Sequence, residues 1–225
     1  MNGFIRLANS SLGKKYLMAI TGLGLFLFVV FHMMGNLQIF LGREAINHYG
    51  HMLKANPEFL WPARIGLVVF VIIHIWTSIV LTLENRAKRE QPYAVKRIVA
   101  ASFASRTMIY SGLLLLSYIV YHLFQFTVLV TNPEYAELRD QLGRHDIYRM
   151  TVLAFSDIRV SAVYIFGMGF LCLHLSHGAS SMFQSIGLKN EANCVLLDRF
   201  GLVAAWVIFV GYSSVPLAVL LKWVK

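Results

Sequence analysis

The sequence predicts an all-α integral membrane protein, a single domain over residues 1–225 built from five transmembrane helices. Hydrophobic residues make up 57% of the chain and charged residues 14%, with a mean hydropathy of +0.62, whereas a soluble domain carries about 25% charged residues. Five stretches lack Asp, Glu, Lys and Arg and are long enough to cross a bilayer, which takes about 20 residues of helix. Backbone groups in lipid must be satisfied within their own segment, which excludes isolated strands.

The charge-free stretches define the five helices in chain order. They cover residues 16–41, 65–83, 107–131, 160–188 and 200–221. We expect helices over about 16–41, 63–84, 106–131, 159–182 and 200–222, because the fourth stretch is longer than a bilayer needs and leaves it near Met182. Pro62 and Pro133 are expected at helix ends, where proline costs little, and Pro216 falls inside the fifth helix.

Basic residues beside the helices predict the orientation of the chain. They precede the first helix or lie between the second and third helices, and are Lys14, Lys15, Arg86, Lys88, Arg89, Lys96, Arg97 and Arg106. The connections on the other side hold most of the acidic residues. The positive-inside rule then places the N-terminus in the cytoplasm and the C-terminus outside. We assign the net charge of +9 to these flanks and to lipid contact. Nucleic acid would need a continuous basic footprint.

Four histidines lie in four different charge-free stretches, at His32, His74, His122 and His174. A single histidine in a membrane helix is more often a hydrogen-bonding contact between helices. Four on separate helices favour a shared function, because ionisable groups in membranes are rare and usually functional. Imidazole is a common axial ligand of haem iron. No other charged group lies in these stretches, so a proton pump or ion carrier of the usual kind is not indicated.

The depth of each histidine sorts the four into two layers. His32 and His122 lie 16 and 15 residues into outward-running helices, about 22–24 Å from the cytoplasmic boundary at about 1.5 Å per residue. His74 and His174 lie near the ends of inward-running helices, about 12–14 Å from the same boundary. Each layer has two histidines from two helices. The pattern predicts two haems of the b type, the outer one between His32 and His122 and the inner one between His74 and His174.

Glycines share the faces of two of these histidines. Gly24 and Gly35 flank His32, whereas Gly167 and Gly178 flank His174. Their missing side chains would leave room for the edge of a porphyrin. The alternative is that small residues let membrane helices pack closely.

Three segments resemble a known family. They are GKKYLMAITGLGLFLFVVFHMMGNLQIFLGREAINHYGHML, IVYHLFQF and HLSHGASSMFQSIG. From about Leu12 to the C-terminus the chain is similar to the dihaem cytochrome b subunit of bacterial succinate dehydrogenases and fumarate reductases. The resemblance implies the same four axial ligands. It favours His174 over His177, because the family's ligand stands four residues before a glycine, here Gly178. His177 could instead hydrogen-bond a haem propionate or a quinone.

The resemblance also implies partners and a role. A flavoprotein subunit with covalent FAD and an iron–sulfur subunit would dock on the cytoplasmic face of a bacterial inner membrane. The basic connection from Arg86 to Arg106 would lie beneath them. That connection needs no partner to explain it, since a positive-inside flank suffices. The expected role is electron transfer between the iron–sulfur subunit and quinone, most often menaquinone, with no dicarboxylate bound by this subunit. Cys172 stands where some relatives carry a proton-conducting glutamate.

Polar residues at the outer end of the first helix and in the loop after it suggest a quinone site near the outer haem. They are Asn36, Gln38, Asn47, His48 and His51, with His51 the preferred residue. A quinone needs hydrogen-bond donors and a proton source, and histidine titrates near neutral pH. The alternative is that these groups only face water. Two other functions stay open: a dihaem quinol-oxidising subunit of another respiratory complex, and a haem-free membrane anchor.

Overall fold

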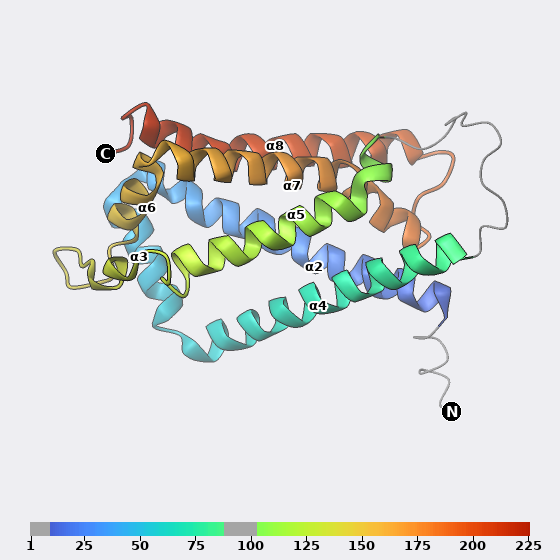
Figure 1. The fold of residues 1–225 in the computed structure, drawn as a ribbon, viewed down its shortest axis with the longest axis horizontal. Helices are drawn as coiled ribbons and strands as arrows, with labels where there is room; N and C mark the ends of the chain where they lie inside the picture. The colour runs from blue at the N-terminus through green and yellow to red at the C-terminus, as the bar shows by residue number, and fades with distance from the viewer. Residues whose placement is uncertain (1–9, 88–102) are drawn as a thin grey trace.

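The computed structural model describes residues 10–87 and 103–225, which form a bundle of long helices (Figure 1). The long helices are α2 (Ser11–Leu37), α4 (Pro57–Ala87), α5 (Phe103–Phe126), α7 (Ile158–Ser185) and α8 (Cys194–Leu220). Shorter elements join them: η1 (Gln38–Leu41), α3 (Arg43–Lys54), η2 (Pro133–Glu137) and α6 (Ile147–Ser156). Within these ranges the one extended pairing is an isolated bridge between Arg139 and His145.

The predicted fold class is confirmed. Five helices, α2 continued by η1 together with α4, α5, α7 and α8, are long and apolar enough to cross a membrane. Large apolar side chains point outward along them, for example Phe31 at 63%, Ile72 at 61% and Phe166 at 70% exposure. A soluble protein would bury such residues, whereas lipid is a favourable solvent for them. The chain is therefore a multi-pass helical membrane protein.

The helix ends differ from the predicted ones where local hydrogen bonding overrides the apolar pattern. α2 begins five residues before Tyr16, because the Ser10 hydroxyl accepts a hydrogen bond from the Gly13 N–H and caps the helix. α5 ends at Phe126 although the apolar stretch continues to Thr131. There Leu129 adopts a φ of 61°, and the Val130 N–H reaches back to the Phe124 carbonyl, which closes the helix. Pro62, expected at a helix end, lies inside α4.

Small residues set the packing of the bundle. α8 lies along α7, and a Cβ at Gly201 of α8 would come within 3.1 Å of the Ser180 backbone nitrogen of α7. Ala205 is fully buried in the same contact. α2 contacts α4, α7 and α8, and α5 packs chiefly on α7, so that α4 and α5 barely touch each other. Helices in lipid approach closely through such small residues, because no hydrophobic effect drives them together.

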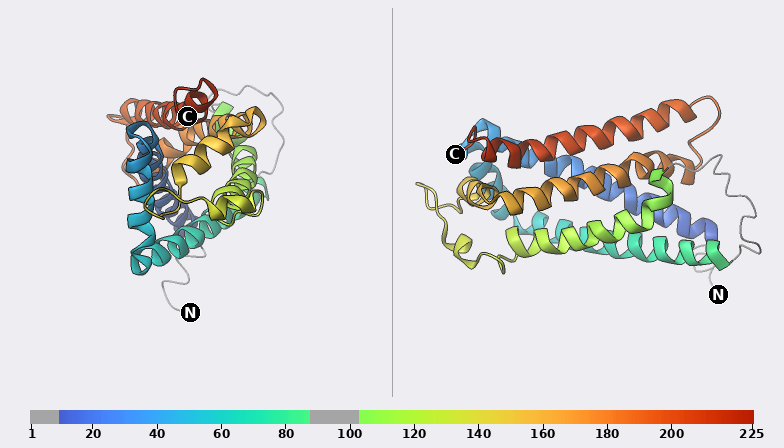
Figure 2. Two further views of the ribbon diagram at one scale, coloured as in Figure 1. Left: turned by 90° about the vertical axis from the view of Figure 1, so that its left-hand side faces the viewer. Right: turned by 45° about the horizontal axis from the view of Figure 1, so that its top comes forward.

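The two short helices α3 and α6 lie across one end of the bundle, which we call the α3 end (Figure 2). A polar network joins them. The Asn47 amide donates to Asp140 and Asp146 and accepts from the Tyr148 N–H, and Arg144 bridges Asp140 and Glu44. Together these contacts tie α3 to the segment from η2 to α6.

The opposite end of the bundle holds the start of α2, the end of α4 and the start of α5. Lys14, predicted as a basic flank, is buried and forms an ion pair with Glu84 of α4. Arg86 and Arg106 lie in the last and first turns of the helices that meet here. The rest of the basic connection, including Lys88, Arg89, Lys96 and Arg97, lies outside the described residues.

Candidate functional site

The four intramembrane histidines meet in two pairs inside the bundle. The rings of His32 on α2 and His122 on α5 have their centroids 5.8 Å apart and an interplanar angle of 78°. The rings of His74 on α4 and His174 on α7 are 6.3 Å apart at 65°. These are the two pairs that the depth of the histidines predicts. Each pair joins a helix of the first half of the chain to a helix of the second half.

The two pairs lie at different levels of the bundle. A Cβ at Gly22 of α2 would lie 3.2 Å from the His74 ring, and a Cβ at Gly112 of α5 would lie 3.5 Å from the His174 ring. His32 and His122 follow these glycines by ten residues, which corresponds to about 15 Å of helix rise. A Cβ at Gly22 would press on the His74 ring, whereas one at Gly112 would make an ordinary van der Waals contact with the His174 ring. The pair of His32 and His122 lies nearer the α3 end and is called the upper pair below. The pair of His74 and His174 is called the lower pair.

Hydroxyl groups fix the protonation of the lower pair. The Thr21 hydroxyl donates to the Leu17 carbonyl, 2.7 Å away, and its oxygen lies 3.3 Å from Nδ1 of His74. The Met18 carbonyl, which can only accept, is 3.2 Å from the same nitrogen. Nδ1 of His74 must therefore carry the proton and donate it. Nε2 then keeps its lone pair and is free to bind a metal.

His174 repeats this arrangement on the other side. The Ser111 hydroxyl of α5 donates to the Met108 carbonyl, 3.1 Å away, and its oxygen lies 3.3 Å from Nδ1 of His174. With the hydroxyl proton directed at Met108, the Ser111 oxygen is placed to accept from Nδ1–H of His174. This arrangement is compatible with the tautomer that a metal ligand requires, in which Nε2 is unprotonated.

Aromatic side chains surround the upper pair. The His32 ring stacks on Phe28 with centroids 5.2 Å apart. Nδ1 of His122 lies 3.3 Å from the Tyr164 hydroxyl, and the rings of Tyr118 and Phe126 are 6.2 and 5.7 Å from the His122 ring. This surrounding is apolar with a single hydroxyl partner, so the two pairs differ in their hydrogen bonding.

At three of the four predicted glycines, an aromatic ring from a neighbouring segment occupies the space that a side chain would fill. A Cβ at Gly24 would overlap Phe70, one at Gly35 would overlap Tyr49, and one at Gly167 would overlap Tyr118. Close helix packing, the alternative given by the sequence, accounts for all three. Gly178 is different, because its nearest neighbours are the Met108 methyl at 3.7 Å and the His174 ring at 4.0 Å.

His177 does not take part in either pair. Its Nε2 lies 2.9 Å from the Ser181 hydroxyl one turn further along α7. His174 instead faces His74, in agreement with the choice that the resemblance favoured. Cys172, two residues before His174, lines an apolar recess between α7 and α8 with Trp206 and Phe209.

The residues predicted for a quinone lie apart from one another. The Asn36 amide donates to the His32 carbonyl of its own helix, and Gln38 begins η1. Asn47 is fully buried with its amide engaged in the network of the α3 end, so a ligand would have to displace protein partners there. His48 and His51 are exposed on α3. Among these five residues, the two histidines are the ones open to a ligand.

The sequence analysis did not single out the residues beside the histidines. Thr21 and Gly22 lie against His74, and Ser111 and Gly112 lie against His174. Gln125 lies one turn after His122 on α5. The signal was present, because a hydroxyl residue followed by glycine stands eleven and ten residues before His32 and again before His122. This is a short repeat between α2 and α5. Gln125 is 2% exposed, and its side-chain carbonyl oxygen has no hydrogen-bond partner. A buried acceptor without a partner is unusual in a folded protein.

The fold and the paired imidazoles define a membrane protein with two two-histidine sites. No group of three or more His, Cys, Asp or Glu side chains that could hold a metal ion occurs in residues 10–87 and 103–225. A metal that takes most of its ligands from protein is therefore not supported there. In comparisons with known proteins, no family model matches the chain, and no curated protein or solved structure matches it.

The spacing of the paired rings fits a metal held between two imidazoles. A metal–imidazole bond measures about 2 Å and the ring centre lies about 1 Å further, so two rings on opposite sides of one metal have centres about 6 Å apart. The observed values are 5.8 and 6.3 Å. Haem iron needs only two axial ligands from protein, because the porphyrin supplies the other four.

Proposed function

We propose that this chain is the membrane anchor and electron-transfer subunit of a bacterial succinate:quinone oxidoreductase, and that it holds two b-type haems. The observation that carries the proposal is the pairing of His32 with His122 and of His74 with His174 at the spacing of axial ligands. The sequence resemblance to the dihaem cytochrome b subunits of succinate dehydrogenases and fumarate reductases supports the assignment to this enzyme class.

The chain's own residues have defined tasks in this proposal. His32, His74, His122 and His174 would hold the iron, and Thr21 and Ser111 would orient His74 and His174 through their contacts with Nδ1. Haem iron bound in this way supplies reversible one-electron chemistry. Phe28, Phe126 and their aromatic neighbours keep water away from the upper pair.

Partner subunits are proposed for the end of the bundle opposite α3. Lys15, Arg86 and Arg106 lie at this end, which the positive-inside rule places in the cytoplasm. A flavoprotein subunit with covalent FAD and an iron–sulfur subunit would dock there. Quinone, with menaquinone as the preferred species, would react near the α3 end, where Gln125 and His51 are available.

The first experiment counts haem in the protein purified in detergent. We expect two b haems per chain by the pyridine haemochrome assay. His74→Ala or His174→Ala should leave one haem, because the remaining imidazole cannot hold the iron from both sides. His177→Ala is the matched control, since it removes an imidazole one turn away on the same helix and should leave both haems.

Four outcomes test the proposed function and its ligand assignment. A protein without haem would make it a haem-free anchor and contradict the proposal. Two haems that persist in His174→Ala but not in His177→Ala would overturn the ligand assignment. Co-purification with a subunit carrying covalent flavin, and reduction of the haems by succinate, would separate this class from other dihaem quinol-oxidising subunits. Haems that succinate leaves oxidised in the intact complex would contradict the enzyme class alone.

A further inference from the structure

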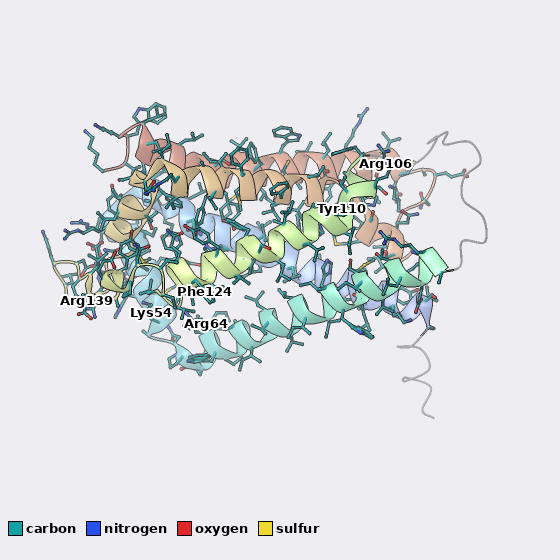
Figure 3. The ribbon with its side chains drawn as sticks, viewed as in Figure 1. Lys54, Arg64, Arg106, Tyr110, Phe124 and Arg139 are labelled. Atoms are coloured by element: carbon teal, nitrogen blue, oxygen red, sulfur yellow. The ribbon has the colours of Figure 1, made fainter. Side chains whose placement is uncertain are left out.

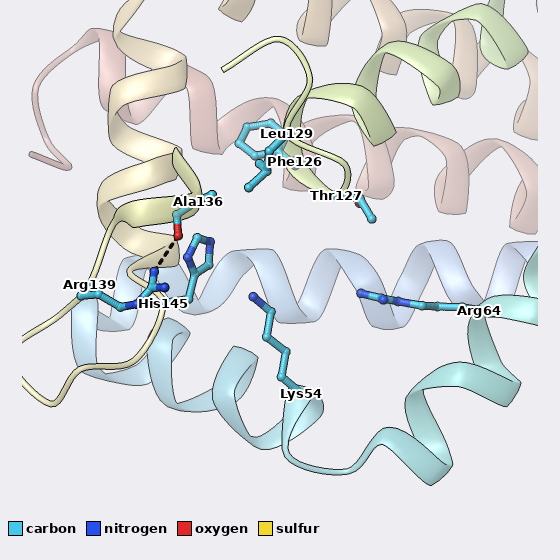
Figure 4. A pocket seen from close by; sticks show the side chains of 8 residues that line it. All are labelled: Lys54, Arg64, Phe126, Thr127, Leu129, Ala136, Arg139 and His145. Carbon is cyan, nitrogen blue, oxygen red and sulfur yellow. Dashed lines mark hydrogen bonds between the residues drawn. The ribbon is translucent and has the colours of Figure 1, made fainter. Parts of the chain in front are cut away.

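A basic recess opens at the α3 end, between the start of α4 and the end of α5 (Figure 4). Lys54, Arg64, Arg139 and His145 line it from three separate segments. Its floor is apolar, formed by Phe126 and Leu129 together with Thr127 and Ala136, and its volume is about 300 Å³. Figure 3 shows Lys54, Arg64 and Arg139 gathered at the end of the bundle away from Arg106.

The three cations of the recess have no carboxylate partner within the described part of the chain. Arg139 donates only to the carbonyls of Ala136 and Leu138, and Arg64 lies over the Trp61 ring at 5.4 Å. Burial and the nearby charges of Arg64 and Arg139 lower the pKa of Lys54. Like charges that converge in this way repel one another unless an anion lies between them.

The neighbouring cations behave differently. Arg43 pairs with Asp146, Arg144 with Glu44 and Asp140, and Arg159 with Asp157. The same end of the protein therefore supplies a carboxylate for each of these arginines and none for the recess. The recess thus gathers three cations in one hollow without a carboxylate from the described residues, and an anion from outside the chain would offset their charge.

The position of the recess identifies the kind of anion. Trp61, 58% exposed, and Arg64 stand near the start of the membrane helix α4, as tryptophan and arginine do at the level of lipid headgroups. Beyond them α4 exposes Ile65, Val68 and Ile72 to the lipid. A phosphate in the recess would thus lie at headgroup depth, with apolar side chains continuing beneath it. A quinone is neutral and would leave three cations uncompensated.

We propose that this recess binds the phosphate headgroup of an anionic phospholipid. Lys54, Arg64 and Arg139 bind the phosphate, and the apolar floor contacts the glycerol and the first part of the acyl chains. Arginine suits such a site because its planar fork matches phosphate oxygens. This inference does not depend on the function proposed above, since neither haem nor quinone enters it.

The test measures binding of dioleoyl phosphatidylglycerol to the delipidated full-length protein in non-ionic detergent by native mass spectrometry. Each basic residue near a membrane surface contributes about a fivefold gain in affinity, so Lys54→Gln/Arg64→Gln/Arg139→Gln should bind about 100-fold more weakly. The matched control is Arg149→Gln/Lys222→Gln/Lys225→Gln, which removes the same charge from exposed residues and should bind like the wild type. Arg64→Gln alone, an exposed change with little risk to folding, should bind about fivefold more weakly.

Several results would overturn the lipid site. Unchanged binding in the recess variants is one, and equal binding of zwitterionic phosphatidylcholine is another. Displacement of the lipid by millimolar inorganic phosphate would show a free phosphate site instead. Loss of haem in step with loss of lipid would mean that the recess serves a haem carboxylate. Selective loss of phosphatidylglycerol with unchanged helicity and haem content supports the proposal.

Discussion

At the residue scale, two hydroxyls determine how the imidazoles of the lower pair can act. The Thr21 and Ser111 hydroxyl oxygens lie 3.3 Å from Nδ1 of His74 and His174, and an acceptor at Nδ1 makes the opposite nitrogen a stronger electron donor. Stronger donation stabilises the oxidised iron. These two residues are therefore positioning residues for the proposed lower haem.

Thr21→Val should raise the midpoint potential of one haem by tens of millivolts and leave the other unchanged. Ser111→Ala should shift the same haem. Thr82→Val is the matched control, because its hydroxyl bonds only to the Ser78 carbonyl. Redox titration in the purified protein measures the shift. Equal potentials in Thr21→Val and Thr82→Val would show that the hydroxyl fills space without tuning the imidazole.

His51 is the residue on which the quinone proposal is tested. It is exposed on α3, whereas the amide of Asn47 is already bound by protein groups. His51→Ala should strongly reduce quinone reduction, because the proton source is removed. Both haems and succinate oxidation by a soluble artificial acceptor should persist. His48→Ala serves as comparison on the same helix. Quinone turnover that survives in His51→Ala would exclude this residue from the quinone site.

At the scale of elements, Arg144 links α3 to the loop before α6. It donates two hydrogen bonds to Glu44, at 2.9 and 2.6 Å, and a third to Asp140. These hydrogen bonds hold the pKa of the Glu44 carboxyl below its ordinary value of 4.5. A carboxyl with a lowered pKa stabilises the fold above that ordinary value and loses the contribution as pH falls through its folded pKa.

The thermal midpoint of the detergent-solubilised protein should therefore fall as pH drops below about 4.5. Glu44→Gln should lower the midpoint only slightly at neutral pH, because solvent screens an exposed ion pair and leaves it a small contribution to stability. The same variant should show a smaller fall in acid than the wild type. A fall of equal size in both proteins would assign the acid sensitivity to other carboxyls.

The helices themselves could be predicted well, and their ends less so. Charge-free stretches locate all five spans, because lipid admits few ionisable groups. The end of α5 could not be read from them, since Thr127 to Thr131 is as apolar as the helix, and the positive φ of Leu129 depends on local hydrogen bonds. The start of α4 before Pro62 was missed because Arg64 and Glu58 look like the flank of a helix.

At the scale of the whole molecule, the pairing of the histidines followed from depth alone. The residues that surround the histidines could not be predicted from depth. Hydroxyl residues and glycines are ordinary in membrane helices, so Thr21 and Gly112 stand out only once the fold places them against His74 and His174. The basic recess was equally hidden, because Lys54, Arg64 and Arg139 are far apart in the sequence and meet only through α3 and the loop after α5.

Each histidine pair joins an earlier helix of the chain to a later one, and this has a consequence for the synthesis and membrane insertion of the protein. α2 and α4 emerge from the ribosome first, and each carries one imidazole whose partner is on a helix not yet synthesised. His122 completes the upper pair when α5 enters the membrane, and His174 completes the lower pair with α7. Neither site exists in the first hairpin alone. Binding a metal between these rings would thus fasten α5 and α7 to the earlier helices, and a filled lower pair would report that α7 has been inserted.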